Sequence, residues 1–443
     1  MLSAPLETAC ALKLLFVHPN LPGQYKLIAP GLAAAGFDVT AIGRYPIATS
    51  SLPGVTVHRY KGSPMRIDPR FPPLDAFANQ VRQGRAAAAL MTRLKEQGYE
   101  PDVIIGHPGW GDLLFAQQVW PAARLISYLE FYYRDSGADY GFDPEFPVEG
   151  QDRQLLTLRN LAQIHAHHLS DLCISPTRWQ RDLFPPAVRR SIHVVHEGVD
   201  TRALKPKHKV RMRPPGGPLL TRETPVLTYS ARNLEPYRGF HVFMRTLPDI
   251  QRDNPDLFTI IVGGDGVSSG RRPPNGANWR EAMLAEVGDR LDHDRIWFAG
   301  KLPYADYQRV LQLSAVHTYL TFPFVLSWSF IEAMACGCTI VGSQTGPVEE
   351  VIEDGVNGRL VPFFDREALR ATVAELLADD EQRARRGAAA RHHARRHYDV
   401  HDVTLPRYAE VIRAIAEGRP ISRKPPPLAT IAAAQTGADA TVD

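Results

Sequence analysis

Short apolar runs rich in β-branched residues alternate with helix-like stretches along most of this 443-residue chain. In the first half these runs are LKLLFV (12–17), DVTAI (38–42), GVTVHRY (54–60), DVIIG (102–106), RLISYL (124–129), DLCIS (171–175) and SIHVV (191–195). Helix-like segments lie between several of them, for example at 25–36 and 75–98. Near-continuous apolar strands that alternate with helices predict a parallel sheet covered on both faces.

The same alternation restarts in the second half. Its expected strands are TPVLTYS (224–230), LFTIIVG (257–263), RIWFAG (295–300), AVHTYLT (315–321) and CTIVGS (338–343), and its expected helices are 239–252, 279–288, 304–313, 329–336 and 347–353. Because the chain exceeds the size that one hydrophobic core supports, two doubly wound α/β domains are expected. The stretch 205–225, rich in Pro, Gly and positive charge, is predicted to be a linker or surface loop.

Composition excludes several classes of protein. A net charge of +3 is too small to indicate a nucleic-acid partner. The N-terminus lacks the basic region of a signal peptide, and no window reaches the roughly 18 apolar residues of a membrane span, so any membrane contact is expected to be peripheral. The cysteines occur in apolar contexts without framework spacing, which favours a reduced, cytoplasmic chain (Cys10, Cys173, Cys336 and Cys338).

Residues that directly follow the strands are the candidate site residues, because open parallel sheets bind ligands beyond the carboxyl ends of their strands. ARNLEPYRGF (231–240) places Arg232 and Arg238 in such a loop, where two guanidiniums suit a pyrophosphate. Solvated surface arginines are the alternative. IIVGGDGVSSG (260–270) contains Gly264, whose backbone could approach a ligand closely, although an ordinary turn also explains it.

The stretch TFPFVLSWSFIEAMACG (321–337) begins as an apolar strand and carries one carboxylate, Glu332. The turn at Val325, Leu326 and Ser327 is expected to offer free amides to an anion before a helix. Glu332 is expected in the first turn of that helix, where it could accept the two hydroxyls of a ribose. The alternative is that Glu332 only complements the helix N-terminus.

Three segments resemble blocks of the retaining group 1 (family 4) glycosyltransferases of GT-B fold. FIEAMACGCTIVGSQTGPVEEVIEDGVNGRLV (330–361) resembles their donor-site block, ARNLEPYRGF their phosphate-binding block and HEGVDT (196–201) their interdomain hinge. The resemblance covers about residues 13–417. It implies two Rossmann-like domains facing across a cleft: an acceptor-side domain over 1–198 and a nucleotide-sugar domain over 199–397. A C-terminal helix at 398–418 would return to the first domain, and 419–443 is expected to be a disordered tail.

The resemblance also implies roles for the residues of the second domain. Glu332 would bind the ribose, Arg232 and Arg238 would act catalytically on the diphosphate, and backbone around Leu302 in GKLPY (300–304) would read the base. The family's usual signature is a Glu-x7-Glu pair, whose first glutamate touches the donor sugar. Phe324 stands in that position here, so this sugar contact is lost.

In the first domain, HPNLPGQYKLI (18–28) resembles the loop beneath the donor phosphate, which makes Gly23 a candidate contact. DVIIGHPGWGDLLF (102–115) resembles the segment whose histidine reaches the reaction centre, here His107, although a structural role is also open. Glu130, which follows RLISYL, is a candidate for binding the acceptor.

Three polar clusters are weighed as alternatives. Asp292-His293-Asp294 forms a DxD pattern but precedes a strand, so a solvated turn is expected; His165, His167 and His168 lack an accompanying carboxylate or cysteine, so no metal site is expected. The basic run 381–398 is expected to be a solvated face or to contact anionic lipid.

Together these features predict a metal-independent hexosyltransferase that needs no cofactor. It would transfer a sugar, with retention, from a UDP- or GDP-linked donor to a hydroxyl of a glycan or lipid-linked acceptor in polysaccharide or glycolipid synthesis. It would work in the cytoplasm, at the inner face of the membrane, without a nucleic-acid partner. The alternatives are an inactive nucleotide- or glycan-binding partner protein and a nucleotide-sugar epimerase.

Overall fold

The computed structural model describes residues 11–46, 49–62, 72–148, 150–274 and 278–422, and these form two compact units. The first unit comprises the described residues up to Asp135, Val148–Gly198 and those from Val400 onward. The second comprises Ser136–Pro147 and Val199–Asp399. Residues 136–147 were expected in the first domain, and this prediction is wrong, because they belong to the second unit. Most of the expected disordered tail, 423–443, lies outside the described residues.

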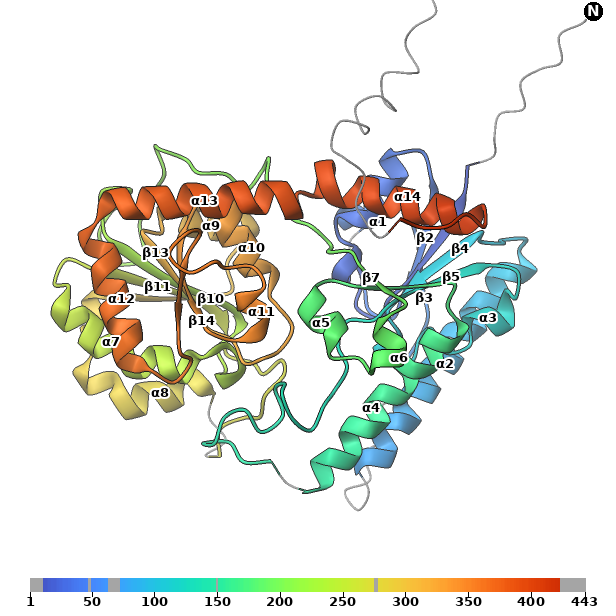
Figure 1. Ribbon diagram of the computed structural model, residues 1–443, viewed down its shortest axis with the longest axis horizontal. Helices are drawn as coiled ribbons and strands as arrows, with labels where there is room; N and C mark the ends of the chain where they lie inside the picture. The colour runs from blue at the N-terminus through green and yellow to red at the C-terminus, as the bar shows by residue number, and fades with distance from the viewer. Residues whose placement is uncertain (1–10, 47–48, 63–71, 149, 275–277, 423–443) are drawn as a thin grey trace, which may run out of the picture. The chain divides into compact units, whose positions relative to one another are not determined.

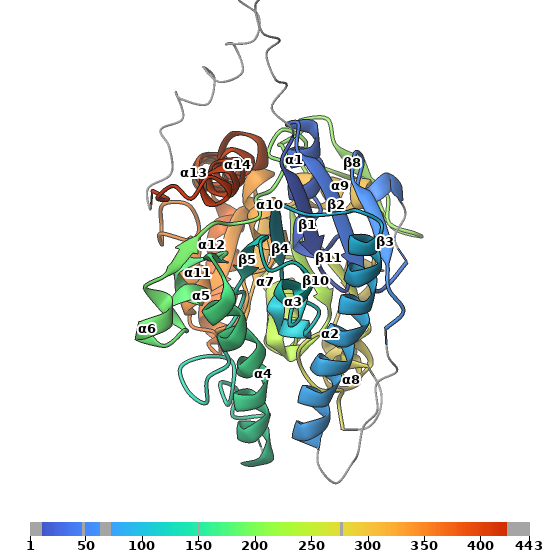
Figure 2. The ribbon, with the colours of Figure 1, turned by 90° about the vertical axis from the view of Figure 1, so that its right-hand side faces the viewer.

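The first unit is built on a seven-stranded parallel sheet with the order β3-β2-β1-β4-β5-β6-β7 (Figure 1). Its strands are β1 Lys13–Val17, β2 Asp38–Gly43, β3 Thr56–Arg59, β4 Val103–Gly106, β5 Arg124–Tyr128, β6 Leu172–Ser175 and β7 Ile192–Val194. Its helices are α1 Ile28–Ala34, α2 Pro72–Glu96, α3 Ala116–Val119, α4 Gly150–Leu169, α5 Arg178–Asp182, α6 Pro186–Arg189 and α14 Leu405–Ala416, with short 3-10 turns η1 Gly23–Tyr25, η2 Thr49–Ser51 and η3 Pro108–Trp110. The long helices α2 and α4 run side by side (Figure 2).

Both faces of this sheet are buried, because successive residues of a strand point to opposite sides. In β1, Leu14 and Phe16 join a cluster that includes Val411 and Ile412 of α14. Leu15 and Val17 instead join the cluster that contains residues of α2 and α3. The C-terminal helix α14 is therefore part of the first unit's core.

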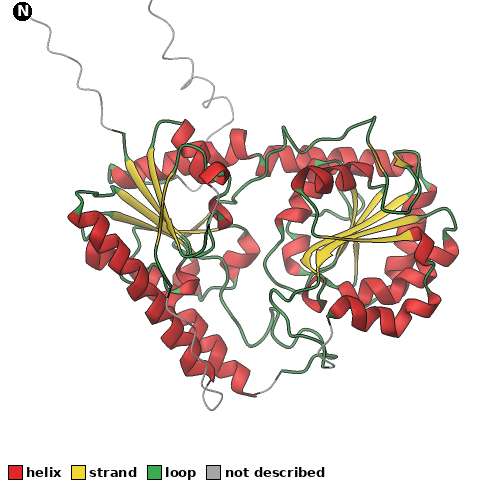
Figure 3. Cartoon of the chain, turned by 180° about the vertical axis from the view of Figure 1, so that it is seen from behind, coloured by secondary structure: helices red, strands yellow, loops and turns green. Residues whose placement is uncertain are grey.

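The second unit is built on a six-stranded parallel sheet with the order β12-β11-β10-β13-β14-β15. Figure 3 shows the strands of each sheet in yellow with helices in red around them. Its strands are β10 Val226–Asn233, β11 Phe258–Gly264, β12 Ile296–Gly300, β13 Val316–Tyr319, β14 Thr339–Ser343 and β15 Arg359–Val361. Its helices are α7 Phe240–Asp253, α8 Trp279–Val287, α9 Tyr304–Leu313, α10 Trp328–Ala335, α11 Gly346–Glu349, α12 Arg366–Ala378 and α13 Asp380–Tyr398, with the 3-10 turn η4 Pro236–Arg238. The predicted α/β class with two parallel sheets is confirmed.

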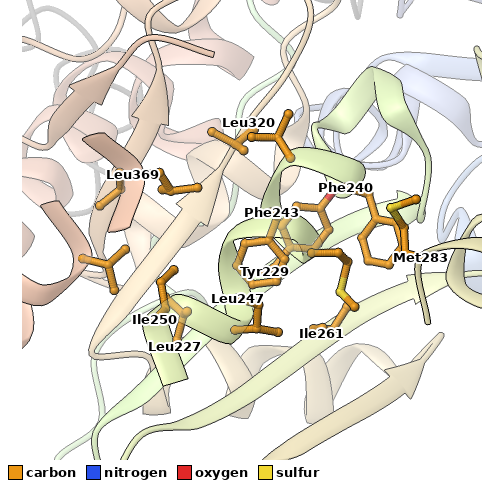
Figure 4. Packing of buried hydrophobic residues seen from close by; sticks show 14 of the residues in the cluster. Leu227, Tyr229, Phe240, Phe243, Leu247, Ile250, Ile261, Met283, Leu320 and Leu369 are labelled. Atoms are coloured by element: carbon orange, nitrogen blue, oxygen red, sulfur yellow. The ribbon is translucent and has the colours of Figure 1, made fainter. Parts of the chain in front are cut away.

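The largest cluster of the second unit lies between β10 and α7 (Figure 4). Tyr229 of β10 stacks on Phe243 of α7 with ring centroids 4.9 Å apart. Leu227 of the same strand and Leu247 of the same helix belong to the same fully buried cluster. Such packing fixes where β10 ends and hence where the loop after it begins.

The prediction that 205–225 is only a linker or surface loop is wrong in part. Within it β8 (Arg211–Met212) pairs antiparallel with β9 (Leu220–Thr221). Leu220 and Val210 are buried in a cluster with Val226 of β10 and Ile260 of β11. The prediction failed because the apolar residues Val210 and Leu220 lie in a segment that is otherwise rich in proline, glycine and charge.

Each sheet has one switch point, where chain order reverses between neighbouring strands. In the first sheet it lies between β1 and β4, and in the second between β10 and β13. Loops that leave the carboxyl ends of strands at a switch point diverge to opposite faces, and this leaves room for a ligand. None of the described helices combines the length and apolar character that crossing a bilayer requires.

Candidate functional site

Polar side chains of the first unit gather where β1, β4 and β5 end. His18 follows β1, His107 follows β4, and Glu130 lies just beyond β5. The buried rings of His18 and His107 are nearly perpendicular, with centroids 5.8 Å apart. Because β1 and β4 flank the switch point, these side chains occupy the expected ligand edge of the first sheet.

His107 and Glu130 form a hydrogen-bonded pair. His107 Nδ1 accepts from the Gly109 amide at 3.1 Å, so the ring proton lies on Nε2, 3.2 Å from Glu130 Oε2. Gln24 Nε2 donates to Glu130 Oε1 at 2.9 Å. Burial raises the pKa of Glu130, but the hydrogen bonds from His107 and Gln24 outweigh this and hold that pKa below its ordinary value. The cluster thus presents an ionised carboxylate near pH 7.

This geometry separates the roles of the two residues. Both ring nitrogens of His107 are engaged, so the histidine orients the carboxylate and does not act as a free base. An ionised carboxylate has about four acceptor positions. Glu130 therefore keeps capacity to accept hydrogen bonds from a sugar or acceptor hydroxyl.

His18 and Gly23 support this pair. Burial, together with repulsion from His107, lowers the pKa of His18 to about 3, so its ring is neutral. Gly23 has a φ of +46°, and a Cβ on it would lie 2.7 Å from His18 Cε1. Packing against His18 therefore requires glycine at this position, whether or not Gly23 also contacts a ligand.

In the second unit, Arg238 is fixed by oxygens from β13 and the loop after it. Its Nη1 donates to Thr321 Oγ1 and the Val325 carbonyl, both at 2.9 Å, and to Tyr319 Oη at 3.3 Å. Its Nε and Nη2 donate to no described residue, which leaves one edge of the planar guanidinium available to an anion. Arg232 is exposed and donates to no described residue.

The loop after β11 is held by Asn233 and Glu235, which were not predicted as site residues. The buried Glu235 accepts from the amides of Ser268, Ser269 and Gly270 at 3.0–3.2 Å. Asn233 Nδ2 donates to Ser268 Oγ at 2.6 Å. In the sequence, the acidic Glu235 close to Arg232 and the Gly/Ser-rich segment 264–270 were the features that could have indicated this contact.

Gly264 lies under Lys301, which was not predicted as a site residue. A Cβ on Gly264 would be 2.4 Å from Lys301 Cε and 2.8 Å from Asn233 Oδ1. Gly264 is thus required by close packing, and it lets the exposed Lys301 bring a positive charge to the end of β11. Leu302, predicted to mark the base site, packs against the cluster around Val226.

The turn before α10 offers fewer free amides than expected. The amides of Val325 and Leu326 donate to no described residue, but that of Ser327 donates to Tyr319 Oη at 2.9 Å. Ser327 is the N-cap of α10, and its hydroxyl accepts from the Ser329 amide. Two amides, not three, are therefore available to a phosphate.

Glu332 is not in the first turn of its helix, as had been expected. Because α10 begins at Trp328, Glu332 lies one turn further along, where attraction to the helix N-terminus has faded. Its Oε1 accepts from Tyr304 Oη at 2.8 Å, at the start of α9. Burial and the Glu332 charge raise the pKa of Tyr304 above its usual value, so Tyr304 remains a donor that orients the carboxylate.

Phe324, which stands where the resemblance predicts a glutamate, packs edge-on against Tyr237 with centroids 5.3 Å apart. Arg238 Cζ lies 5.8 Å from the centre of the Phe324 ring. An aromatic face, instead of a carboxylate, therefore borders the fixed arginine.

One group of the described residues brings potential metal ligands together. Ligand atoms of Asp143, Glu145 and His241 lie within 4.8 Å of one another. However, both Glu145 oxygens accept from Arg245, at 2.6 and 2.8 Å, and His241 Nε2 pairs with Asp143 at 2.9 Å. Arg245 already supplies the positive charge, so we interpret this group as an ion-pair network.

The clusters weighed in the sequence are engaged in local contacts. Asp292 pairs with Arg295 at 2.7 Å and accepts from the Asp294 amide. His167 Nε2 lies 2.7 Å from Ser191 Oγ. Asp292 and His167 are thus engaged in contacts within the protein.

Replacing Glu332 with glutamine is expected to weaken ribonucleotide binding by about tenfold or more, because a hydroxyl that donates to a carboxylate forms a stronger bond than one that donates to an amide. Calorimetric titration of a ribonucleoside diphosphate measures this loss. The matched 2′,3′-dideoxy nucleotide is the control, since it offers no hydroxyls. An equal loss for both ligands would contradict the ribose role.

Comparisons with known proteins match both halves of the chain. Residues 35–204 match a model described as glycosyl transferase family 4 group, and residues 218–393 match glycosyl transferases group 1. A GDP-mannose-dependent α-(1-6)-phosphatidylinositol monomannoside mannosyltransferase of Mycolicibacterium smegmatis is 30% identical over 51% of this chain and 58% of its own length. A D-inositol 3-phosphate glycosyltransferase of Kribbella flavida is 27% identical over 82% of each chain. The chain thus spans about half the length of several curated relatives it matches.

Solved structures share the fold over nearly the whole chain. Anabaena HepE, in complex with UDP and glucose, superposes with a TM-score of 0.64 at 17% identity, covering 91% of this chain and 100% of that one. Sucrose-phosphate synthase of Thermosynechococcus elongatus gives 0.64 at 15% identity, covering 97% and 100%. The two halves of this chain thus match glycosyltransferase domains, those of the family 4 group over residues 35–204 and those of group 1 over residues 218–393.

Proposed function

We propose that this protein is a retaining hexosyltransferase that moves a sugar from a UDP- or GDP-linked donor to a hydroxyl of a glycan or lipid-linked acceptor. The observation that carries this proposal is the fixed Arg238 at the β10/β13 switch point, with one free guanidinium edge. The relatives support a glycosyl donor and an inositol- or lipid-containing acceptor, because one is named for GDP-mannose and others for inositol phosphates.

The second unit would bind the donor nucleotide. Glu332, oriented by Tyr304, accepts the ribose hydroxyls, and Arg238 with Arg232 and Lys301 contacts the diphosphate. As the bond between the sugar and the diphosphate breaks, negative charge builds on the leaving phosphate oxygen. Donors already fixed in place stabilise that charge without reorganisation, which is often the largest contribution to catalysis.

The first unit would act on the transferred sugar and the acceptor hydroxyl. Glu130, held ionised by His107 and Gln24, accepts hydrogen bonds from hydroxyls and so orients them. In a front-face reaction the acceptor oxygen bonds to the anomeric carbon on the side from which the diphosphate leaves. The acceptor's proton then passes to the leaving phosphate oxygen, and the configuration is retained.

We further expect turnover without a divalent cation or cofactor, because three side-chain cations are available to the diphosphate. Peripheral contact with anionic lipid would use α13, on which Arg385, Arg395 and Arg396 are exposed. Each such charge adds about 1 kcal/mol near an anionic surface.

The test is incubation with UDP- and GDP-sugars and a panel of hydroxyl acceptors, with and without EDTA. Released nucleotide and glycosylated product are measured, and the anomeric configuration of the product is determined by NMR. The proposal expects transfer with retention that survives EDTA. Nucleotide binding without turnover would indicate a binding partner protein, and nucleotide release with an altered free sugar would indicate an epimerase.

A further inference from the structure

A segment from the first half of the chain is built into the second unit. Residues Ser136–Pro147, which we call the strap, belong to the second unit, whereas Met1–Asp135 and Val148–Gly198 on either side belong to the first. The strap contains no helix or strand. Side-chain contacts hold it on the second unit. Phe142 packs on Phe363 and Phe364, which follow β15, and two further groups of contacts bear on the site.

The first group anchors the end of the strap on α7 and α8. Asp143 pairs with His241 of α7 at 2.9 Å, and both side chains are only 2% exposed. Phe146 packs edge-on against His241 and against Trp279 of α8, with centroids 5.5 and 5.3 Å apart. Separating these contacts would expose two buried polar groups and two packed aromatic rings, so this anchor is costly to release.

The second group of contacts reaches the proposed donor site. Tyr237 Oη donates to Asp139 Oδ2 at 3.0 Å. Phe142 packs on Phe322 with centroids 5.0 Å apart, and Phe322 in turn stacks on Tyr237 at 4.8 Å. The strap thus holds the Tyr237 ring by its hydroxyl and supports the aromatic residue on which that ring lies.

Tyr237 is directly linked to the phosphate-binding arginine. It precedes Arg238 in the turn η4, and its carbonyl accepts from the Phe322 amide at 2.9 Å and from Thr321 Oγ1 at 3.4 Å. Thr321 Oγ1 also accepts from Arg238 Nη1. A shift of the Tyr237 ring would therefore move both the backbone of Arg238 and one of its three supporting oxygens.

We propose that the strap completes the donor half-site of the second unit and that Asp139 is a positioning residue, which orients Arg238 through Tyr237. This inference rests on the proposed function, because it takes the Arg238 site as the diphosphate site. The contacts of Asp139 and Phe142 lead to the support of Arg238, whereas Glu332 is oriented by Tyr304 of α9. Loss of the strap's contacts should therefore affect the diphosphate and spare the nucleoside.

The test compares Asp139→Ala, Tyr237→Phe and the double variant in full-length protein. Each single variant should weaken binding of UDP or GDP, whichever the wild type binds, by about three- to tenfold, the range of one lost hydrogen bond. Both changes remove the same hydrogen bond. The affinity of the double variant for the diphosphate should therefore equal that of the single variant that binds it less tightly. Affinity for the corresponding nucleoside should not change. Glu286→Ala, which removes an exposed partner of Arg245 on α8, is the matched control.

The outcomes separate this inference from the proposed function. Wild-type protein that binds neither diphosphate would overturn the donor site and, with it, the strap's role. Wild-type binding that both single variants retain in full would overturn the strap's role alone, as would equal losses for diphosphate and nucleoside. Thermal melting checks folding, and Tyr237→Phe, which removes one oxygen, keeps the test valid if Asp139→Ala fails to fold.

Discussion

Replacing Arg238 with alanine is expected to lower kcat/KM for sugar transfer by about 10²- to 10³-fold, the usual loss when one preorganised donor to a developing anion is removed. The reason is the fixed geometry of the side chain. Nη1 is held by Thr321, Val325 and Tyr319, so the remaining nitrogens meet the leaving diphosphate without reorganisation. Steady-state kinetics on the donor found in the transfer assay measures the loss.

Two further variants define what the Arg238 result means. Arg238→Lys keeps the charge but cannot reproduce the planar fork, so its activity should lie between wild type and Arg238→Ala. Arg252→Ala removes an exposed arginine of α7 that pairs with Asp249, and it should leave kinetics unchanged. An Arg238→Ala variant within threefold of wild type would contradict the leaving-group role.

The sequence predicted the two sheets because most of their strands are apolar runs that alternate with helices, although β15 was not predicted. The loop residues at the switch points followed from this pattern, since a strand's end fixes which residues come next. Arg238 was found in this way, whereas His107 was named from the resemblance of segment 102–115 to the glycosyltransferase family. What Arg238 touches was not predictable, because its three oxygens come from β13 and the loop after it, about 80 residues further along the chain.

The strap shows a second limit of sequence reasoning. An irregular segment carries no periodicity, so local pattern cannot indicate which unit it packs on. The only sign was a pair of aromatic residues, Phe142 and Phe146, within a stretch rich in Gly, Asp and Pro. Similarly, local pattern could not indicate that Glu235 accepts from the Gly270 amide or that Lys301 packs over Gly264, because each contact joins distant parts of the chain.

The Asp112→Asn variant is expected to be more stable than wild type above pH 7 and about equal to it near pH 5. Asp112 is 1% exposed, and neither carboxylate oxygen has a hydrogen-bond partner among the described residues. Burial raises the pKa of Asp112 to about 7, although attraction to Arg44 partly opposes this. In the unfolded chain the same group titrates at its ordinary value, about 3.9.

The sign of the effect follows from proton binding. Between pH 4 and 7 the folded protein holds a proton on Asp112 that the unfolded chain has released, so the free energy of unfolding falls as pH rises. The shift corresponds to about 4 kcal/mol at most. The asparagine amide also lacks hydrogen-bond partners at this buried position, which costs part of that stabilisation. We therefore expect the free energy of unfolding of Asp112→Asn to exceed that of wild type by about 2 kcal/mol at pH 8. Thermal melting should show this as a rise in Tm of about 4 to 8 °C.

The decisive observation is how the Tm difference between Asp112→Asn and wild type changes with pH, and not the size of that difference at one pH. Glu96→Gln changes an exposed acid of α2 in the same unit and should shift Tm equally little at pH 5 and pH 8. Asp112→Asn should instead diverge from wild type progressively as the pH rises from 5 to 8. A constant difference across that range would mean that Asp112 is ionised in the folded protein throughout. Arg44 would then have to compensate a carboxylate that is almost fully buried.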